Sequence, residues 1–208
     1  MSNKIIGIIE AKDMMSTDIV CWFCQKQLSP RALFCNHCGA IQPVRPLDHF
    51  ARLGIERRID IDQTTLDRQF AGMQKTLSPD RFAIRTATER TYAAKQLEAL
   101  TAAYEVLRDP VKRGRYWLTM HNKEFEDAQA TIAIVQEMRL QCEQAGSAPE
   151  IDRVAHKATQ AFEEGITRLM QSLRQQNWQG ANETLLELDG MENILSEARQ
   201  KRRDMEKR

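Results

Sequence analysis

Four cysteines near the N-terminus have the residue type and the spacing of metal ligands. Cys21 and Cys24 form one C-x-x-C pair, Cys35 and Cys38 form a second, and ten residues separate the two pairs. Such a pair is typical of a short knuckle whose thiolates point into one coordination sphere, and four thiolates make a closed tetrahedral site for Zn²⁺. A closed site has no open position for a substrate, so we expect the zinc to be structural.

A bound metal also explains how so short a segment can fold. About twenty residues cannot bury enough apolar surface for a stable fold, whereas structural zinc contributes an apparent binding free energy on the order of 10–16 kcal/mol. Two disulfides and a rubredoxin-like iron centre are the alternatives for these cysteines. Disulfides need an oxidising compartment, but the apolar run from Ile5 to Ile9 is too short for an export signal or a membrane span. The sequence therefore favours zinc and a cytoplasmic protein.

Composition narrows the classes of function. A net charge of +1 over 208 residues argues against a general nucleic-acid binder. The chain has no Gly-rich phosphate loop, no H-E-x-x-H motif and no constellation of nucleophile and base. Cys142 stands apart from the paired cysteines and is expected to be a small, buried or half-exposed thiol. We therefore expect a protein without catalytic activity of its own.

After Pro46 the apolar residues recur at helical spacing, and little alternating pattern is present. Up to about residue 119 we expect a compact unit with three helices, at about 47–54, 64–76 and 89–107. Gly54 serves as the stop of the first helix, and Arg68 and Lys75 fall on the polar side of the second. Asp109-Pro110 ends the third helix.

The region from about residue 123 predicts a bundle of three further helices. The first runs from about residue 124 to 144 and ends at Gly146, and the second begins at Pro149. A break at 177–180 precedes the third helix. The charged tail at 201–208 is expected to be a frayed, solvated helix end.

The loop between the second and third predicted helices reads LSPDRF at residues 77–82, and here the chain resembles a J domain. This helical-hairpin module stimulates ATP hydrolysis by DnaK-type chaperones. Three further parts resemble the family's opening helix, third helix and final short helix: residues 48–54, residues 100–110, and Arg113, Tyr116 and Trp117. With the four-cysteine module before it and helices after it, the chain over residues 21–208 resembles the HscB type of J-domain co-chaperone, which serves iron–sulfur cluster assembly.

This resemblance implies partners and a shape. The chain is expected to bind a DnaK/HscA-type chaperone, to stimulate its ATPase, and to deliver an iron–sulfur scaffold protein held by the C-terminal bundle. An L-shaped molecule that is a monomer or a weak dimer is implied, with no nucleic acid and no membrane among its partners. The resemblance assigns chaperone binding to the loop and to basic positions that face an acidic chaperone surface, namely Ser78, Pro79, Asp80, Arg81, Lys75 and Arg68.

One of these residues departs from the family pattern, because the family's loop reads His-Pro-Asp and this chain has Ser78. Asp80 can still accept a charge-assisted hydrogen bond from a chaperone arginine, and Pro79 can still set the shape of the loop. Serine offers neither the packing surface nor the second nitrogen of an imidazole. Loss of one such contact costs ~2 kcal/mol or more, so we hypothesise that ATPase stimulation is weakened or absent unless the chaperone has compensated for the change.

Register with the family predicts where its scaffold-binding residues fall in this chain. They fall on the first helix of the C-terminal bundle and, for an aromatic position on the last helix, near Gly190. The first-helix positions are Ile132, Ala133 and Gln136, and Met191 substitutes for the aromatic residue. Ile134 and Met138 are the alternatives if the register shifts, and the other alternative is a scaffold-binding surface that has diverged from the family's.

We therefore predict a mainly α protein in four parts: a flexible N-terminus at 1–18, a four-cysteine zinc module of short β-hairpins at 19–42, a J-like domain at 46–119 and a scaffold-binding three-helix bundle at 123–208. The predicted function is that of an iron–sulfur co-chaperone. One alternative is a J-like protein with a degenerate Ser-Pro-Asp motif that acts as a binding or regulatory factor without stimulating an ATPase. A further alternative is a cysteine module that senses metal supply or redox state.

Overall fold

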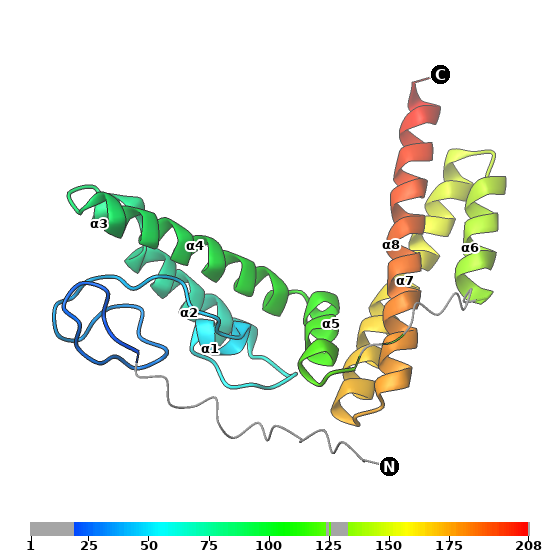
Figure 1. Cartoon of the computed structure of the whole chain (residues 1–208). Helices are drawn as coiled ribbons and strands as arrows, with labels where there is room; N and C mark the ends of the chain where they lie inside the picture. The colour runs from blue at the N-terminus through cyan, green and yellow to red at the C-terminus, as the bar shows by residue number, and fades with distance from the viewer. Residues whose placement is uncertain (1–18, 124, 126–132, 208) are drawn as a thin grey trace, which may run out of the picture.

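The computed structural model describes residues 19–123, 125 and 133–207, which contain eight helices. These are α1 (His49–Leu53), α2 (Gln63–Thr76), α3 (Pro79–Phe82), α4 (Ala87–Arg108), α5 (Pro110–Met120), α6 (Ala133–Gln144), α7 (Ala148–Arg174) and α8 (Trp178–Glu206). The molecule is an L of two arms that meet at α5 (Figure 1). The first arm holds the cysteine module and α1 to α4, and the second holds α6 to α8. The predicted mainly helical, L-shaped fold is confirmed.

Two expected features of the chain lie outside the described residues. One is the flexible N-terminus at 1–18, and the other is the start of the first C-terminal helix, including Ile132. None of the described helices is both long and apolar enough to span a membrane.

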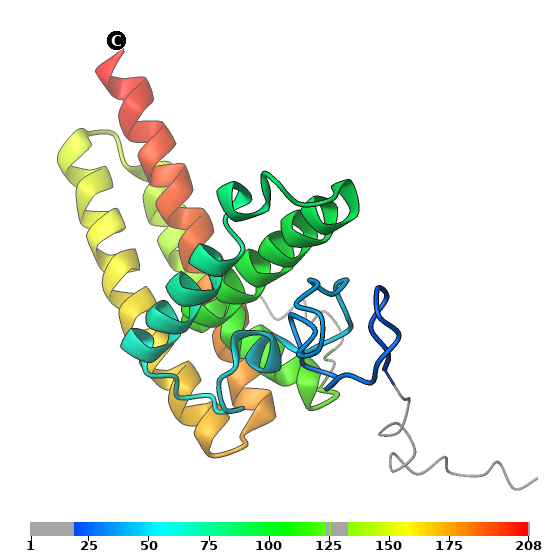
Figure 2. The same ribbon diagram turned by 90° about the vertical axis from the view of Figure 1, so that its left-hand side faces the viewer.

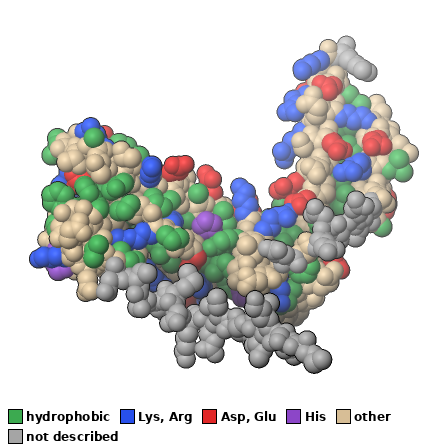
Figure 3. Space-filling view, viewed as in Figure 1, with side chains coloured by type: hydrophobic (Ala, Val, Ile, Leu, Met, Phe, Trp, Pro, Cys, Tyr) green, Lys and Arg blue, Asp and Glu red, His purple; other side chains and the backbone are tan. Residues whose placement is uncertain are grey.

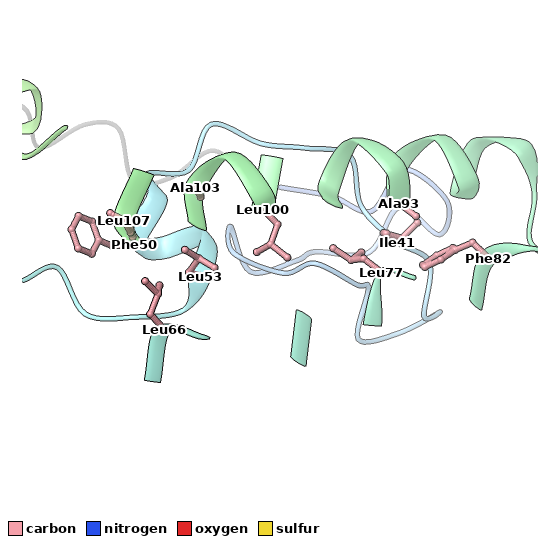
Figure 4. Close-up of a cluster of buried hydrophobic side chains, with 10 residues drawn as sticks. All are labelled: Ile41, Phe50, Leu53, Leu66, Leu77, Phe82, Ala93, Leu100, Ala103 and Leu107. Carbon is pink, nitrogen blue, oxygen red and sulfur yellow. The ribbon is translucent and has the colours of Figure 1, made fainter. Parts of the chain in front are cut away.

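The first arm is built on a helical hairpin of α2 and α4, with α1 packed against both. The rings of Phe70 and Tyr104 stack across the hairpin with centroids 4.0 Å apart, and the Tyr104 hydroxyl donates a hydrogen bond to Asp67. Gly54 ends α1 as predicted, because its φ of 65° lies in the left-handed region that glycine adopts freely. Figure 4 shows the core of this arm, whose buried members are Ile41, Phe50, Leu53, Leu66, Leu77, Phe82, Ala93, Leu100, Ala103 and Leu107.

The corner of the L is an apolar cluster shared by both arms. Val111 and Leu118 of α5 pack with Leu169 of α7 and with the first buried residues of α8, namely Ala181, Leu185 and Leu188. Gly114 permits this approach, since a Cβ at that position would lie 3.0 Å from a methyl group of Leu169. The cluster contains residues from both sides of the expected boundary between 46–119 and 123–208. The division into these domains stays a prediction.

The second arm is a three-helix bundle. Helices α7 and α8 run side by side along it, and α6 covers the end that lies away from the corner (Figures 1 and 2). The α7 helix begins near Pro149 as predicted, with the carboxylate of Glu150 accepting hydrogen bonds from the backbone N–H groups of Gly146 and Ser147. Gly190 of α8 lies under α6, and a Cβ there would lie 2.6 Å from both γ-methyl groups of Val135.

The charged C-terminal tail differs from its prediction, because α8 continues to Glu206 instead of fraying at residue 201. The ammonium group of Lys201 donates hydrogen bonds to the carbonyl oxygens of Cys142 (2.9 Å) and Glu143 (2.7 Å) at the end of α6. Met205 packs against the apolar cluster of the same bundle. The tail is therefore held by the last carbonyl groups of a neighbouring helix, which need donors from outside that helix.

Gly190→Ala tests the close packing of α6 on α8. We expect a net destabilisation of about 1 kcal/mol, because overpacking against the stiff Val135 side chain costs about 1–3 kcal/mol and alanine's higher helix propensity offsets about 1 kcal/mol. Denaturant unfolding at equilibrium measures the change. The control is Gly72→Ala, an exposed position of α2 with no atom within 4 Å of the new methyl group, where the same substitution should be neutral or stabilising.

Candidate functional site

The four paired cysteines come together in the first arm. Their sulfur atoms all lie within 4.8 Å of one another. The sulfur atoms of Cys21 and Cys38 are 3.7 Å apart, and those of Cys24 and Cys35 are 3.6 Å apart. A tetrahedral ion with metal–sulfur bonds of about 2.3 Å has sulfur–sulfur separations of about 3.8 Å. The donor set therefore fits a four-coordinate metal ion, and the cysteines are free thiols rather than disulfides.

Two similar knuckles position these sulfur atoms. In each knuckle the first cysteine's N–H donates to a carbonyl five residues later, from Cys21 to Lys26 and from Cys35 to Ala40, at 2.9 Å in both. The turn needs a left-handed residue four positions after that cysteine, and Gln25 and Gly39 occupy it with φ values of 61° and 73°. The predicted β-hairpins are present only as single antiparallel bridges, Val20 with Gln27 and Phe34 with Ile41.

Hydrogen bonds around the sulfur atoms favour thiolates at two of the four positions. Burial acts to raise the pKa of Cys21, but hydrogen bonds from the backbone of Cys24 and Phe23 and from the side chain of Gln42 outweigh it and lower that pKa to about 6. The pKa of Cys35 is lowered for the same kind of reason.

The fourth thiol behaves in the opposite way. A backbone hydrogen bond from Ala40 acts to lower the pKa of Cys38, but burial and the three neighbouring sulfur atoms raise it to about 12. Negative charge thus accumulates beside a thiol that keeps its proton. A divalent cation relieves that repulsion and displaces the proton, which is the chemistry expected of a thiolate metal site.

The Ser-Pro-Asp loop lies at the end of the first arm, between α2 and α4 (Figure 1). Pro79 is the first residue of α3, a single helical turn that the sequence did not predict, and Asp80 lies in its first turn. In the described structure the Ser78 hydroxyl makes no capping hydrogen bond to this turn. Pro79, Asp80 and Arg81 are exposed. The loop therefore presents Asp80 to solvent, where a partner can reach it.

The basic residues assigned to chaperone binding are also accessible. Arg68 and Lys75 are exposed on α2, about three turns and about one turn before Ser78, and Arg81 is exposed within the loop. Figure 3 shows that hydrophobic side chains gather at the end of the first arm and that charged side chains follow the second arm.

Comparison with known proteins adds an independent observation. No protein-family model matches the chain. The chain is 26% identical over 187 residues to the human iron-sulfur cluster co-chaperone protein HscB, which covers 84% of this chain and 78% of that protein. It is 26% identical over 167 residues to the Arabidopsis thaliana HscB homolog, which covers 77% of this chain and 66% of the homolog. The crystal structure of human HscB matches with a TM-score of 0.80 at 23% identity, over 88% of this chain and 98% of that structure.

The chain is similar to HscB co-chaperones. The resemblance inferred from the sequence motifs is therefore confirmed, and the structural match establishes the fold. The match to the HscB structure covers 88% of this chain, which is more residues than either arm contains. The likeness therefore includes both arms and not the loop alone.

The residues assigned to scaffold binding by register with HscB are only partly accessible. Ala133 and Gln136 are exposed on α6. Met191 has 0% exposure and packs in the core of the second arm, so its side chain does not reach a partner and this part of the prediction is wrong. An aromatic side chain at Gly190 is excluded by Val135. Exposed apolar surface on α6 comes instead from Ile134 and Leu140, which are 39% and 52% exposed.

Replacing one metal ligand tests the site. We expect Cys35→Ser to lose the bound metal, since an alcohol is a poor substitute for a thiolate ligand. Elemental analysis of the purified chain should then fall from about one metal ion per chain to near zero, with the knuckles becoming sensitive to protease. Cys142→Ser makes the same chemical change at a buried thiol of the second arm and should leave the metal content unchanged. Equal metal content in the two variants would contradict the site.

Proposed function

We propose that this chain is a co-chaperone of iron–sulfur cluster assembly. It binds a DnaK/HscA-type chaperone through the Ser-Pro-Asp loop, stimulates the chaperone's ATPase and delivers a scaffold protein held by the second arm. The observation that carries the proposal is the likeness to HscB over 84% of the chain in sequence and 88% in structure. The chain acts as a regulator of another protein's catalysis and not as a catalyst.

The loop supplies the chemistry for the chaperone contact. Asp80 is an exposed carboxylate at the start of a helical turn, so it can accept a bidentate, charge-assisted hydrogen bond from an arginine of the chaperone. Pro79 fixes its own φ and thereby the entry into that turn. The exposed bases Arg68, Lys75 and Arg81 add a positive field that draws an acidic surface toward the loop.

We propose Zn²⁺ as the metal of the four-cysteine site. The donor set is entirely thiolate, its separations suit tetrahedral coordination, and four protein ligands complete that geometry without a substrate position. The ion would hold the knuckles in place, and its role in the co-chaperone is structural.

Free thiols at all five cysteines agree with a reducing compartment, and the proposed compartment is the cytoplasm.

The scaffold protein is proposed to bind on α6. Ala133 and Gln136 remain the assigned contacts, and Ile134 supplies an exposed apolar side chain beside them. This surface is on the second arm, at the start of α6 where Val135 packs on Gly190 midway along α8, and the Ser-Pro-Asp loop is at the end of the first arm (Figure 1). A chaperone and a scaffold protein can therefore occupy separate surfaces of one monomeric or weakly dimeric chain.

Ser78 favours a second candidate function. A serine at this position lacks the ring of the family's histidine, and its hydroxyl does not cap α3 in the described structure. The alternative is a J-like protein that binds the chaperone or the scaffold protein as a regulatory factor without stimulating ATP hydrolysis.

Single-turnover ATP hydrolysis by the DnaK/HscA-type chaperone separates the two functions. For the co-chaperone we expect stimulation by the native chain, a loss of tenfold or more in Asp80→Asn, corresponding to about 1.4 kcal/mol or more, and a gain in Ser78→His. Stimulation that appears only in Ser78→His would favour the regulatory factor. Equal rates with the native chain and Asp80→Asn would contradict the loop contact.

Charge reversal on α2 tests the docking face. We expect Lys75→Glu to weaken chaperone binding at low salt, and the difference from the native chain should shrink as salt rises, because exposed charges are screened over about 8–10 Å at physiological ionic strength. Titration calorimetry at two salt concentrations measures both effects. Lys157→Glu makes the same change on an exposed position of α7 and should bind like the native chain. Identical affinities for both variants would rule out docking through α2.

A further inference from the structure

The second knuckle contributes side chains to the core of the first arm. Phe34 and Ile41 face each other across an antiparallel bridge and enclose the pair Cys35 and Cys38. Ile41 is 1% exposed and belongs to the same buried cluster as Phe82, which lies beside it in the close-up (Figure 4). The metal-binding module is therefore part of the packing of this arm.

The same knuckle contacts the Ser-Pro-Asp loop directly. The ring of Phe34 stacks on the ring of Phe82 with a centroid distance of 6.5 Å and an interplanar angle of 11°. Phe82 is the last residue of α3 and its buried residue, so it anchors the turn that presents Asp80. Phe34, one residue before a metal ligand, forms one wall of that anchor.

Backbone hydrogen bonds within the loop are all local. The N–H groups of Arg81, Ala83 and Arg85 donate to the carbonyl groups of Ser78, Asp80 and Phe82, at 3.0, 3.4 and 3.0 Å. Ile84, which follows the turn, is 95% exposed and adds no packing. Because such short-range bonds order a loop only weakly, the orientation of α3 depends on the packing of Phe82.

Buried polar contacts connect the sulfur cluster to α4. The side-chain amide of Gln42 donates to the sulfur of Cys21 (3.4 Å) and to the carbonyl of Ala40 (2.8 Å), and the carbonyl of Gln42 accepts a hydrogen bond from Gln96 on α4 at 3.0 Å. Gln42 and Gln96 are 0% and 7% exposed. The Trp22 ring packs edge-on against Tyr92 of α4 with centroids 5.5 Å apart. These contacts hold the module against the hairpin independently of Phe34.

We infer that the metal-held second knuckle positions the Ser-Pro-Asp loop, with Phe34 as the positioning residue. Metal binding closes the knuckle, the closed knuckle holds the Phe34 ring against Phe82, and Phe82 holds the turn that carries Asp80. When the metal or the Phe34 ring is lost, the turn that carries Asp80 becomes less ordered. The part of this inference that concerns chaperone affinity rests on the proposed function, whereas the ordering of the loop does not.

Hydrogen exchange of the full chain, without any chaperone, tests the ordering of the loop. We expect Phe34→Ala to accelerate exchange of the Arg81, Ala83 and Arg85 amides about twofold or more, since an aromatic pair contributes about 0.5–1.5 kcal/mol. Phe34→Leu, which keeps apolar bulk, should give an intermediate rate. The control is Phe23→Ala, the same substitution at an aromatic residue of the first knuckle that is 66% exposed, and it should exchange like the native chain.

Removal of the metal from the native chain by a chelator tests the same link by a second route. The loop amides should again exchange faster, while the amides of α7 and α8 in the second arm should not change. If neither chelation nor Phe34→Ala alters exchange at the loop, or if Phe23→Ala alters it equally, the inference is wrong.

Chaperone binding then separates this inference from the proposed function. We expect Phe34→Ala, whose metal content is first checked by elemental analysis, to bind the DnaK/HscA-type chaperone about two- to tenfold more weakly than Phe23→Ala. Faster exchange in Phe34→Ala together with no chaperone binding by the native chain would overturn the proposed function and leave the ordering of the loop established. Unchanged exchange in Phe34→Ala, together with normal chaperone binding by the native chain, would overturn the ordering of the loop by Phe34 and leave the proposed function standing.

Discussion

The convergence of four cysteine sulfur atoms is the constraint on which the first arm depends. The module has few apolar residues of its own to bury, and its small cluster contains two of the cysteines themselves, Cys21 and Cys35, with Leu28 and Ala40. Repulsion among the sulfur atoms opposes their convergence unless a cation is bound. The second knuckle also places Ile41 in the core of the helical hairpin. The cysteine module and the hairpin that carries the loop therefore share one core.

The apolar cluster at the corner of the L joins the second arm to the first. A glycine in α5 allows the close approach of α7, and the ion pair between Asp60 and Arg174 spans the two arms beside the shared apolar cluster. The guanidinium of Arg174 holds the pKa of Asp60 below its ordinary value, but the pair is exposed, so the apolar cluster determines how the arms are joined. The Ser-Pro-Asp loop and α6 are thereby kept at opposite ends of the molecule.

Much of the architecture could be predicted because it depends on local signals. The end of α1 at Gly54 and the start of α7 near Pro149 follow from the conformational preferences of those residues. The short turn α3 was missed because four residues carry no periodic pattern. The fraying of the tail was predicted wrongly because a charged sequence looks solvated until its partners are known, and Lys201 has partners on a helix almost sixty residues earlier in the chain.

The sequence by itself determined the four-cysteine pattern, most of the longer helices and the departure at Ser78, since each is a matter of residue type and spacing over a few turns of chain. Only the tertiary structure decided which of the matched positions face solvent. It buried Met191, filled the space at Gly190 with Val135, and set Phe34 against Phe82. The physical reason is that packing between distant segments depends on how whole helices and knuckles meet, and local periodicity places a residue on a face of its helix without saying what covers that face.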